Sequence, residues 1–206
     1  MWVVLLGPDG AGKSSVIVGL GRGVLAGFVG CETFHLRPAL GRRERTSEAN
    51  TNPHGQAARG VVATIGKLAY LLVVNWLAYF AVVKPRVRRG ALVLFDRYFP
   101  DCLVDAKRYR LPTSCQWLTE LIARLVPRPD LCVVLDAPPR RLWERKREVP
   151  VTELLRQCHE YARLGERLSN VSVVDAARSL PDVVNEVVDR IIERHLTETR
   201  GKSQAA

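Results

Sequence analysis

Residues 2–15 read WVVLLGPDGAGKSS, an apolar run that breaks into the spacing Gly7-x-x-x-x-Gly12-Lys13-Ser14. We expect Trp2–Leu6 to form a buried parallel strand and a helix to begin near Lys13. Between them, the glycines allow backbone N–H groups to point at phosphate oxygens, and the helix adds the positive end of its dipole. The full spacing therefore predicts a phosphate-binding loop and not an ordinary strand-to-helix turn.

The side chains of this loop are those that a magnesium–nucleoside triphosphate requires. Lys13 is expected to reach the β- and γ-phosphates, Ser14 to place its hydroxyl on Mg²⁺, and Ser15 to hold an α-phosphate oxygen. The residues expected to contact the triphosphate are Gly7, Asp9, Gly10, Ala11, Gly12, Lys13, Ser14 and Ser15. The motif thus predicts a nucleoside triphosphate with Mg²⁺ as one ligand.

The composition is that of an ordinary globular protein. The 206 residues are 47% hydrophobic and 25% charged, which suits a single domain with one core. Five cysteines are scattered without C-x-x-C pairs or histidines at ligand spacing, so we expect neither a disulfide framework nor a zinc site. No signal peptide precedes the loop, and we expect a cytoplasmic location.

The charge of the chain favours an anionic partner. The formal net charge is +10 and the pI is about 9.8, which suits small phosphorylated ligands, a membrane surface or nucleic acid. The basic residues are spread over many segments and are not interleaved with aromatic residues as in nucleic-acid modules. We therefore expect a small phosphorylated ligand and no specific binding of nucleic acid.

The segment Leu68–Val83 is nearly all apolar and lies between two lysines. Its sixteen residues, interrupted by Asn75, are fewer than the roughly 20 needed to cross about 30 Å of hydrocarbon. We expect it to belong to a long helix that is buried in the core or in a subunit interface. The cationic residues at 84–89 leave peripheral contact with an anionic membrane surface open.

Apolar strands alternate with helical segments along the rest of the chain. Strands are expected at 29–36, 91–95, 131–135 and 171–174, and helices at 13–25, 58–83, 101–110, 114–125, 153–168 and 181–195, with a basic helix or loop at 138–148. Such a series predicts an α/β fold, with a doubly wound parallel five-stranded sheet and helices on both faces. We assign one domain to residues 1–196, with a mobile loop at 38–58 and a disordered tail at 197–206.

In a sheet of this kind, ligands bind beyond the carboxyl ends of the strands. His35 and Arg37 follow the second expected strand, and Asp96 closes the third. An aspartate at that position would complete a magnesium clamp with Ser14. The competing interpretation makes Asp96 a helix N-cap and Arg97 a solvated neighbour.

Four blocks together resemble the thymidylate kinase family of P-loop nucleoside monophosphate kinases over nearly the whole chain. The blocks are Gly7–Ser15, Asp96-Arg97-Tyr98, residues 129–146 with Leu135-Asp136-Ala137-Pro138-Pro139, and Val174-Asp175-Ala176 followed by Leu180. The resemblance implies a P-loop NTPase fold, ATP and Mg²⁺ as cofactors, and a homodimer formed through the long helices.

The resemblance also implies roles for single residues. Asp9 would point toward an acceptor hydroxyl, and Arg97 would grip an acceptor phosphate. A lid over ATP at 138–150 would include Arg141, Arg145 and Arg147. The alternative interpretation of these three arginines is that they lie on a solvated helix face. Ala176 and Ala177 would border the adenine. The residues expected to act in catalysis are Lys13, Asp9, Asp96, Arg97, Arg141 and Arg145.

The chain departs from the family where the acceptor is recognised. A Glu-Pro-Gly-Gly turn is replaced by His35-Leu36-Arg37-Pro38, and the stretch that reads thymine is replaced by residues 99–105. An arginine of the long helix is replaced by Asn75. The pattern is more similar to divergent thymidylate-kinase-like proteins associated with bacterial surface-polysaccharide loci.

Two chemistries remain open for the acceptor. Arg37, Arg97, Arg108 and Arg110 suit a phosphate, whereas Asp101 and Asp105, four apart on one helical face, suit a hydroxyl that must lose its proton. The two aspartates could instead pair with Arg108 or cap a helix, and His35 could be a structural histidine. The residues expected at the acceptor are His35, Arg37, Arg97, Tyr98, Asp101, Asp105 and Arg108.

We therefore predict an ATP- and Mg²⁺-dependent kinase that phosphorylates a nucleoside monophosphate, such as dTMP, or another small phosphorylated compound. One alternative is a kinase that phosphorylates a sugar hydroxyl of a polyol acceptor in surface-polysaccharide metabolism. The other is a non-catalytic, ATP-binding regulatory or membrane-associated P-loop module.

Overall fold

The structure is a computed structural model that describes residues 1–22, 27–35, 60–147 and 149–204. The mobile loop predicted at 38–58 lies outside the described residues, as does Arg37.

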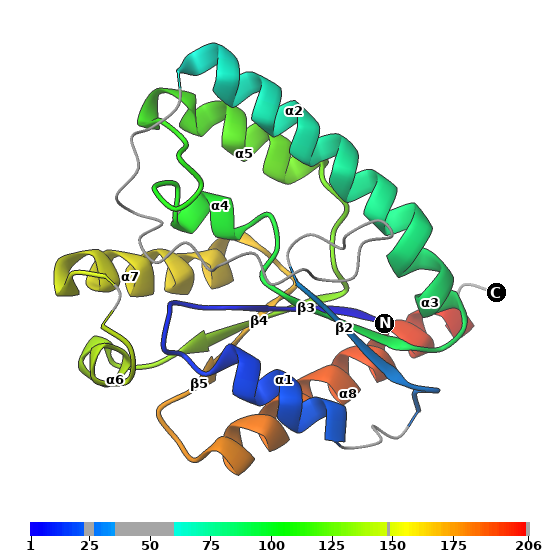
Figure 1. The fold of residues 1–206 in the computed structure, drawn as a ribbon. Coiled ribbons are helices and arrows are strands. Elements are labelled where there is room, and N and C mark those ends of the chain that lie inside the picture. The colour runs from blue at the N-terminus through cyan, green and yellow to red at the C-terminus, as the bar shows by residue number, and fades with distance from the viewer. Residues whose placement is uncertain (23–26, 36–59, 148, 205–206) are drawn as a thin grey trace.

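A five-stranded parallel sheet forms the centre of the molecule (Figure 1). The strands are β1 (Trp2–Leu6), β2 (Cys31–His35), β3 (Leu92–Asp96), β4 (Leu131–Asp136) and β5 (Val171–Asp175), and their order across the sheet is β2-β3-β1-β4-β5. The three central strands are almost wholly buried apolar runs, as expected for a parallel sheet covered on both faces. The predicted α/β fold with a doubly wound five-stranded parallel sheet is confirmed.

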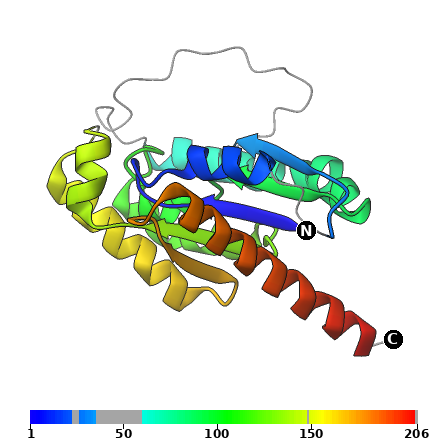
Figure 2. The same cartoon turned by 90° about the horizontal axis from the view of Figure 1, so that it is seen from below.

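Two layers of helices cover the sheet, and each has its own part of the core. On one face, α1 (Lys13–Arg22) and α8 (Leu180–Gln204) pack against alternate strand residues such as Val3 and Leu5. On the other face, the long helix that begins at Val61 and α5 (Gln116–Leu125) cover residues such as Val4 and Leu6. Figure 1 shows the two layers on opposite sides of the sheet, and Figure 2 shows α8 extending toward the C-terminus.

The apolar segment belongs to one continuous helix at Val61–Arg88, longer at its carboxyl end than predicted. It consists of α2 (Val61–Ala78), a π-helical stretch η1 (Tyr79–Val83) and α3 (Lys84–Arg88). By length and composition alone, this helix could cross a membrane. However, residues such as Leu68 and Leu71 are buried in the core of the domain, which makes it a packed helix of this fold.

The prediction of a buried helix is wrong for its outer face. Only 22% of its most apolar window is buried. The large apolar residues that it exposes are Val61, Val62, Ile65, Tyr70, Val73, Trp76, Leu77 and Phe80. A subunit interface, the other half of the prediction, remains a proposal because hydropathy does not distinguish a core from a surface that a partner covers.

The remaining helices differ from the predicted ones mainly in length. They are α4 (Asp101–Val104), a 3₁₀ turn η2 (Thr113–Cys115), α6 (Pro139–Arg145) and α7 (Val151–Arg167). The helix predicted at 101–110 is wrong beyond its first turn. The disordered tail is wrong as far as Gln204, because α8 continues through it, with Arg194 and Glu198 paired at the i,i+4 spacing. The domain limit at 196 and the lid at 138–150 stay predictions.

Candidate functional site

The phosphate loop joins the buried strand β1 to α1, as predicted. Gly10 has φ +85°, and a Cβ there would lie 2.8 Å from the carbonyl oxygen of Leu142 in α6. Gly7 has φ +141°, and a Cβ there would lie 2.5 Å from the carbonyl oxygen of Leu135. Both positions therefore require glycine, because a side chain would be strained and would collide with backbone. The helix begins at Lys13, so its free N–H groups lie at the end of the loop.

The side chain of Lys13 folds back onto the backbone of the phosphate loop. Its Nζ donates hydrogen bonds to the carbonyl oxygens of Gly7 and Pro8, at 2.7 and 2.9 Å. Burial, followed by the nearby charge of Arg97, lowers the pKa of Lys13 to about 8. A triphosphate would offer this ammonium group a stronger acceptor than the two carbonyls.

A cleft of about 630 Å³ opens at the carboxyl ends of the strands. It brings together predicted residues for the triphosphate, the metal and the acceptor, although they are distant in sequence. Those that line it are Asp9, Gly10, Ala11, Gly12, Lys13, Ser14, Ser15, Asp96, Arg97, Arg108, Arg145 and Ala176. Because residues from the segments that follow β1, β3, β4 and β5 line one cleft, these segments are expected to share a ligand site.

The cleft has an oxygen donor set that suits Mg²⁺. Asp96 ends β3 and lies in register with Leu5, just before the phosphate loop, and both Asp96 and the exposed Ser14 line the cleft. Among the described residues, no group of three or more His, Cys, Asp or Glu side chains could hold a metal. An ion held by Ser14 and Asp96 would complete its shell with phosphate and water oxygens, as Mg²⁺ typically does.

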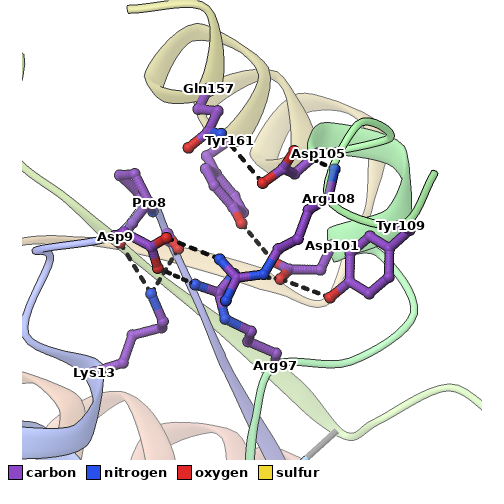
Figure 3. Close-up of polar contacts among 11 residues, drawn as sticks. Pro8, Asp9, Lys13, Arg97, Asp101, Asp105, Arg108, Tyr109, Gln157 and Tyr161 are labelled. Atoms are coloured by element: carbon purple, nitrogen blue, oxygen red, sulfur yellow. Dashed lines mark hydrogen bonds and ion pairs between the residues drawn. The ribbon is translucent and has the colours of Figure 1, made fainter. Parts of the chain in front are cut away.

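Two arginines converge on Asp9 at the other end of the cleft (Figure 3). Arg97 donates from Nη2 to Asp9 Oδ1, and Arg108 donates from Nη1 to Asp9 Oδ2 at 2.8 Å. Burial alone would raise the pKa of Asp9, but the charges of Arg97 and Arg108 outweigh it and lower the pKa. Asp9 is therefore a carboxylate held between two guanidinium groups.

Asp101 and Asp105 do not line this cleft, and their predicted helical face is absent. Asp101 is fully buried and accepts hydrogen bonds from Arg97, Tyr109 and Tyr161. Asp105 follows the last turn of α4 and accepts from the backbone N–H of Arg108 and from the side-chain amide of Gln157. Because protein donors occupy both carboxylates, the prediction that they serve an acceptor hydroxyl is wrong, and their alternative as structural partners is supported.

Tyr98 also lies apart from the cleft. Its ring is buried against Trp2 and Phe95, and its hydroxyl donates to the carbonyl oxygen of Pro127 at 2.8 Å. The prediction that it contacts the acceptor is therefore wrong. His35 ends β2 in register with Asp96, so its backbone lies at the correct edge of the sheet.

The predicted lid arginines differ in position. Arg145 lines the cleft and donates to the carbonyl oxygen of Ala176 at 3.2 Å. Arg141 donates at 2.5 Å to the carbonyl oxygen of Ala177, the other residue expected near adenine. Arg147 instead places its guanidinium 4.3 Å from the ring centroid of Trp143. Of the three, Arg145 therefore has the position best suited to reach phosphate oxygens.

Several residues that line the cleft, or that bind the aspartates behind it, were not predicted from the sequence. Lys146 and Arg178 line the cleft. Lys146 is the last residue of the motif block 129–146, and Arg178 lies two residues after Ala176, so the motif blocks offered a usable signal for both. Tyr161 and Gln157, which bind Asp101 and Asp105 from behind, are four apart on α7. That spacing places them on one helical face, but nothing in the local sequence shows what the face meets.

Curated relatives of the chain are thymidylate kinases. A thymidylate kinase of Xylella fastidiosa is 29% identical over 94% of this chain and 91% of its own, and that of another strain is 28% identical over 94% and 87%. A probable thymidylate kinase of Thermococcus onnurineus is 32% identical, over 56% of this chain and 58% of its own length. No family model matches the chain.

Solved structures share the fold. The thymidylate kinase of Candida albicans superposes with a TM-score of 0.66 at 13% identity, covering 94% of this chain and 91% of that one. The deoxyadenosine kinase of M. mycoides, solved with bound dATP, gives a TM-score of 0.57 at 14% identity, covering 93% and 99%.

The fold and the phosphate loop define a P-loop kinase, that is, an ATP-dependent phosphotransferase. The relatives that match over most of the chain make it a divergent, thymidylate-kinase-like member of that class.

Proposed function

We propose that this chain transfers the γ-phosphoryl group of ATP to a nucleoside monophosphate, such as dTMP, or to another small acceptor that already carries a phosphate. The observation that carries the proposal is the pair of guanidinium groups, Arg97 and Arg108, that meet at Asp9 beside the phosphate loop. Two guanidinium groups in a fork geometry suit a phosphate, and a phosphate acceptor needs no base to become a nucleophile.

The residues of the chain divide the work along the cleft. Lys13 and the loop N–H groups would orient the triphosphate, and Ser14 and Asp96 would hold Mg²⁺, which neutralises charge on the β- and γ-phosphates. Arg145 reaches the cleft from the lid-like segment, where positive charge would stabilise the moving phosphoryl group. Catalysis would consist of alignment and charge, as a loose transition state requires.

The alternative acceptor, a sugar hydroxyl, has less support. A hydroxyl benefits from a carboxylate that takes its proton, but Asp101 and Asp105 are engaged by protein donors. Asp9 is the carboxylate nearest to the acceptor end, and two arginines hold it in the ionised form with little basicity. A non-catalytic module is also less supported, because charged groups line both ends of the cleft.

The proposal is tested by ADP release with nucleoside monophosphates, nucleosides, sugars and sugar phosphates as acceptors. We expect turnover with a phosphorylated acceptor and loss of turnover in Lys13→Ala. Turnover confined to unphosphorylated sugars would favour the sugar kinase. ATP binding without turnover of any acceptor, together with a partner whose association Lys13→Ala abolishes, would favour the non-catalytic module.

We also infer that a second copy of the chain covers the exposed face of the helix Val61–Arg88. The α5 helix lies beside α2 (Figure 1), and Trp76 of α2 donates to the carbonyl oxygen of Leu125 in α5. The α5 helix also exposes large apolar residues, namely Trp117, Leu121 and Leu125. A two-fold pairing of these helices would cover the large apolar side chains that both of them expose. This pairing agrees with the homodimer that the family resemblance implies. We also propose that the reaction takes place in the cytoplasm.

A further inference from the structure

Arg97 occupies a backbone conformation that must be stabilised by its surroundings. It follows β3 with φ +72°, the left-handed region that residues other than glycine seldom adopt. Its backbone N–H donates to the carbonyl oxygen of Leu5 at 3.0 Å, which ties it to the strand that leads into the phosphate loop. Strained residues of this kind persist where neighbouring groups determine their position, commonly at functional sites.

The guanidinium of Arg97 has one edge in the core and one at the cleft. Its Nη1 donates to Asp101 Oδ2 at 2.5 Å, while its Nη2 donates to Asp9 Oδ1 (Figure 3). The side chain of Asp101 is fully buried, whereas those of Arg97 and Asp9 keep 13% and 12% of their surface exposed. Asp101 thus lies behind the arginine as seen from the cleft.

Two tyrosines complete the shell around Asp101. Tyr161 of α7 donates its hydroxyl to Oδ1, and Tyr109 donates to Oδ2 at 3.3 Å. Burial, and then the charge of Asp101, raise the pKa of both phenols well above the ordinary value. Both hydroxyls therefore keep their protons at neutral pH and remain donors to the carboxylate.

We propose that Asp101, fixed by Tyr161 and Tyr109, is a positioning residue: it holds the Arg97 guanidinium so that its Nη2 edge, paired with Asp9 in this structure, faces the part of the cleft where the acceptor's anionic group would bind. The inference rests on the proposed function, because it takes the acceptor phosphate as the group that Nη2 meets. A long arginine side chain loses rotamer freedom when it grips a ligand. Holding it in place beforehand removes that cost from binding.

The first test is Tyr161→Phe, which removes one donor to Asp101 and leaves the aromatic ring in the core. We expect KM for the phosphorylated acceptor to rise roughly 3- to 10-fold, the size of one buried hydrogen bond, with KM for ATP unchanged. The matched control is Tyr98→Phe, which removes the buried hydroxyl that donates to Pro127, remote from the cleft. The control should leave both KM values unchanged.

The second test needs no turnover. The Nε–Hε resonance of Arg97, assigned by its loss in Arg97→Lys, reports how firmly the guanidinium is held in the ligand-free protein. We expect a sharp, slowly exchanging resonance in the wild type and in Tyr98→Phe, and a broadened or rapidly exchanging one in Tyr161→Phe and Asp101→Asn. Thermal unfolding of each variant identifies those that simply fail to fold.

The outcomes separate this inference from the function on which it rests. If no phosphorylated acceptor is turned over, the proposed function fails, while the resonance still tests whether Asp101 holds Arg97. An Arg97 resonance that is the same in the wild type and Tyr161→Phe would overturn the positioning role. So would KM values for ATP and the acceptor that rise together, because a general loss of structure would move both.

Discussion

The two ends of the cleft hold charge in different ways. At the end proposed for the triphosphate, the consecutive loop residues 9–15 line the cleft, and Lys13 donates to the backbone carbonyl oxygens of Gly7 and Pro8. At the acceptor end, the groups are side chains that pair with one another. They come from the phosphate loop, the turn after β3, the turn after α4 and helix α7.

The two ends are expected to respond differently when a side chain is removed. A backbone cradle keeps its shape when a side chain is removed, so a lost side chain there costs its own contribution to catalysis. In a network of ion pairs, a lost member also frees its partners to move.

The largest effect is expected at the triphosphate end, from Lys13→Ala. We expect kcat to fall on the order of 10²–10³-fold, because the positive charge nearest the β- and γ-phosphates is removed. The thermal unfolding temperature should not fall, since the buried ammonium is desolvated and its pKa is lowered to about 8. ADP release and thermal unfolding measure the two quantities.

Lys107→Ala is the control for this substitution. Lys107 is exposed and lies 3.2 Å from Glu153 on the surface, a pair that contributes little. Its kcat should stay within about twofold of the wild type. An unchanged kcat in Lys13→Ala would contradict the assignment of the loop.

The next effect is expected at the acceptor end, from Arg108→Ala. We expect KM for the phosphorylated acceptor to rise roughly 10- to 100-fold, because a hydrogen bond to a charged group contributes about 1.5–3 kcal/mol. KM for ATP should hold steady, since Arg108 lies on the Asp9 side of the cleft. Steady-state kinetics with each substrate varied in turn measure both constants.

The exposed Arg140, paired with Glu144 on α6, provides the control. Arg140→Ala should change neither constant. If Arg108→Ala raised KM for ATP as much as KM for the acceptor, the two ends of the cleft would not be separate sites.

The central strands and the phosphate loop were predictable because their causes are local. Strands buried on both faces read as continuous apolar runs, and Trp2–Leu6 has the predicted bounds. The loop is encoded by glycines within nine residues, which need no distant partner to adopt positive φ. The placement of Asp96 at the same cleft as Ser14 was predictable as well, because Asp96 ends a strand and strand ends meet at one edge of the sheet, whereas their role as a metal pair stays a prediction.

The acceptor end was not predictable because its structure depends on distant partners. Asp101 and Asp105 are four apart, which indicated one helical face, but the helix ends at Val104. Asp105 accepts from the N–H of Arg108 and starts a turn, a common role of aspartate that competes with helix. Tyr161 reaches Asp101 from 60 residues away, and no periodicity reveals such a contact.

A smaller effect is expected from pH, and it belongs to the triphosphate end. In the ligand-free protein the pKa of Lys13 is lowered to about 8, while a bound triphosphate would favour the charged ammonium and raise it. Binding therefore takes up a proton above pH 8, and ATP affinity should fall by up to about tenfold per pH unit there. Calorimetric titration with ATP at several pH values measures this slope, which should be absent in Lys13→Met.

The same pKa predicts the stability of the ligand-free protein. Lys13 ordinarily has a pKa of 10.5, so between about pH 8 and pH 10.5 the unfolded chain binds the extra proton. The free energy of unfolding should therefore rise with pH in this window, relative to Lys13→Met, which lacks the titrating group. Parallel curves for the two proteins would contradict the lowered pKa.

The smallest effect on catalysis is expected outside the cleft, from Leu77→Glu. Leu77 is 52% exposed on α2, within the apolar surface assigned to a second copy. A glutamate there would be desolvated in the interface, so we expect dimers to dissociate while kcat changes less than about twofold. Light scattering after size-exclusion chromatography measures the mass.

Leu196→Glu on α8, at a leucine that is 51% exposed, is the matched control and should remain dimeric. A monomeric wild type would contradict the second copy. If Leu77→Glu instead abolished binding to anionic vesicles, the cationic residues at 84–89 would mark this face as a membrane contact.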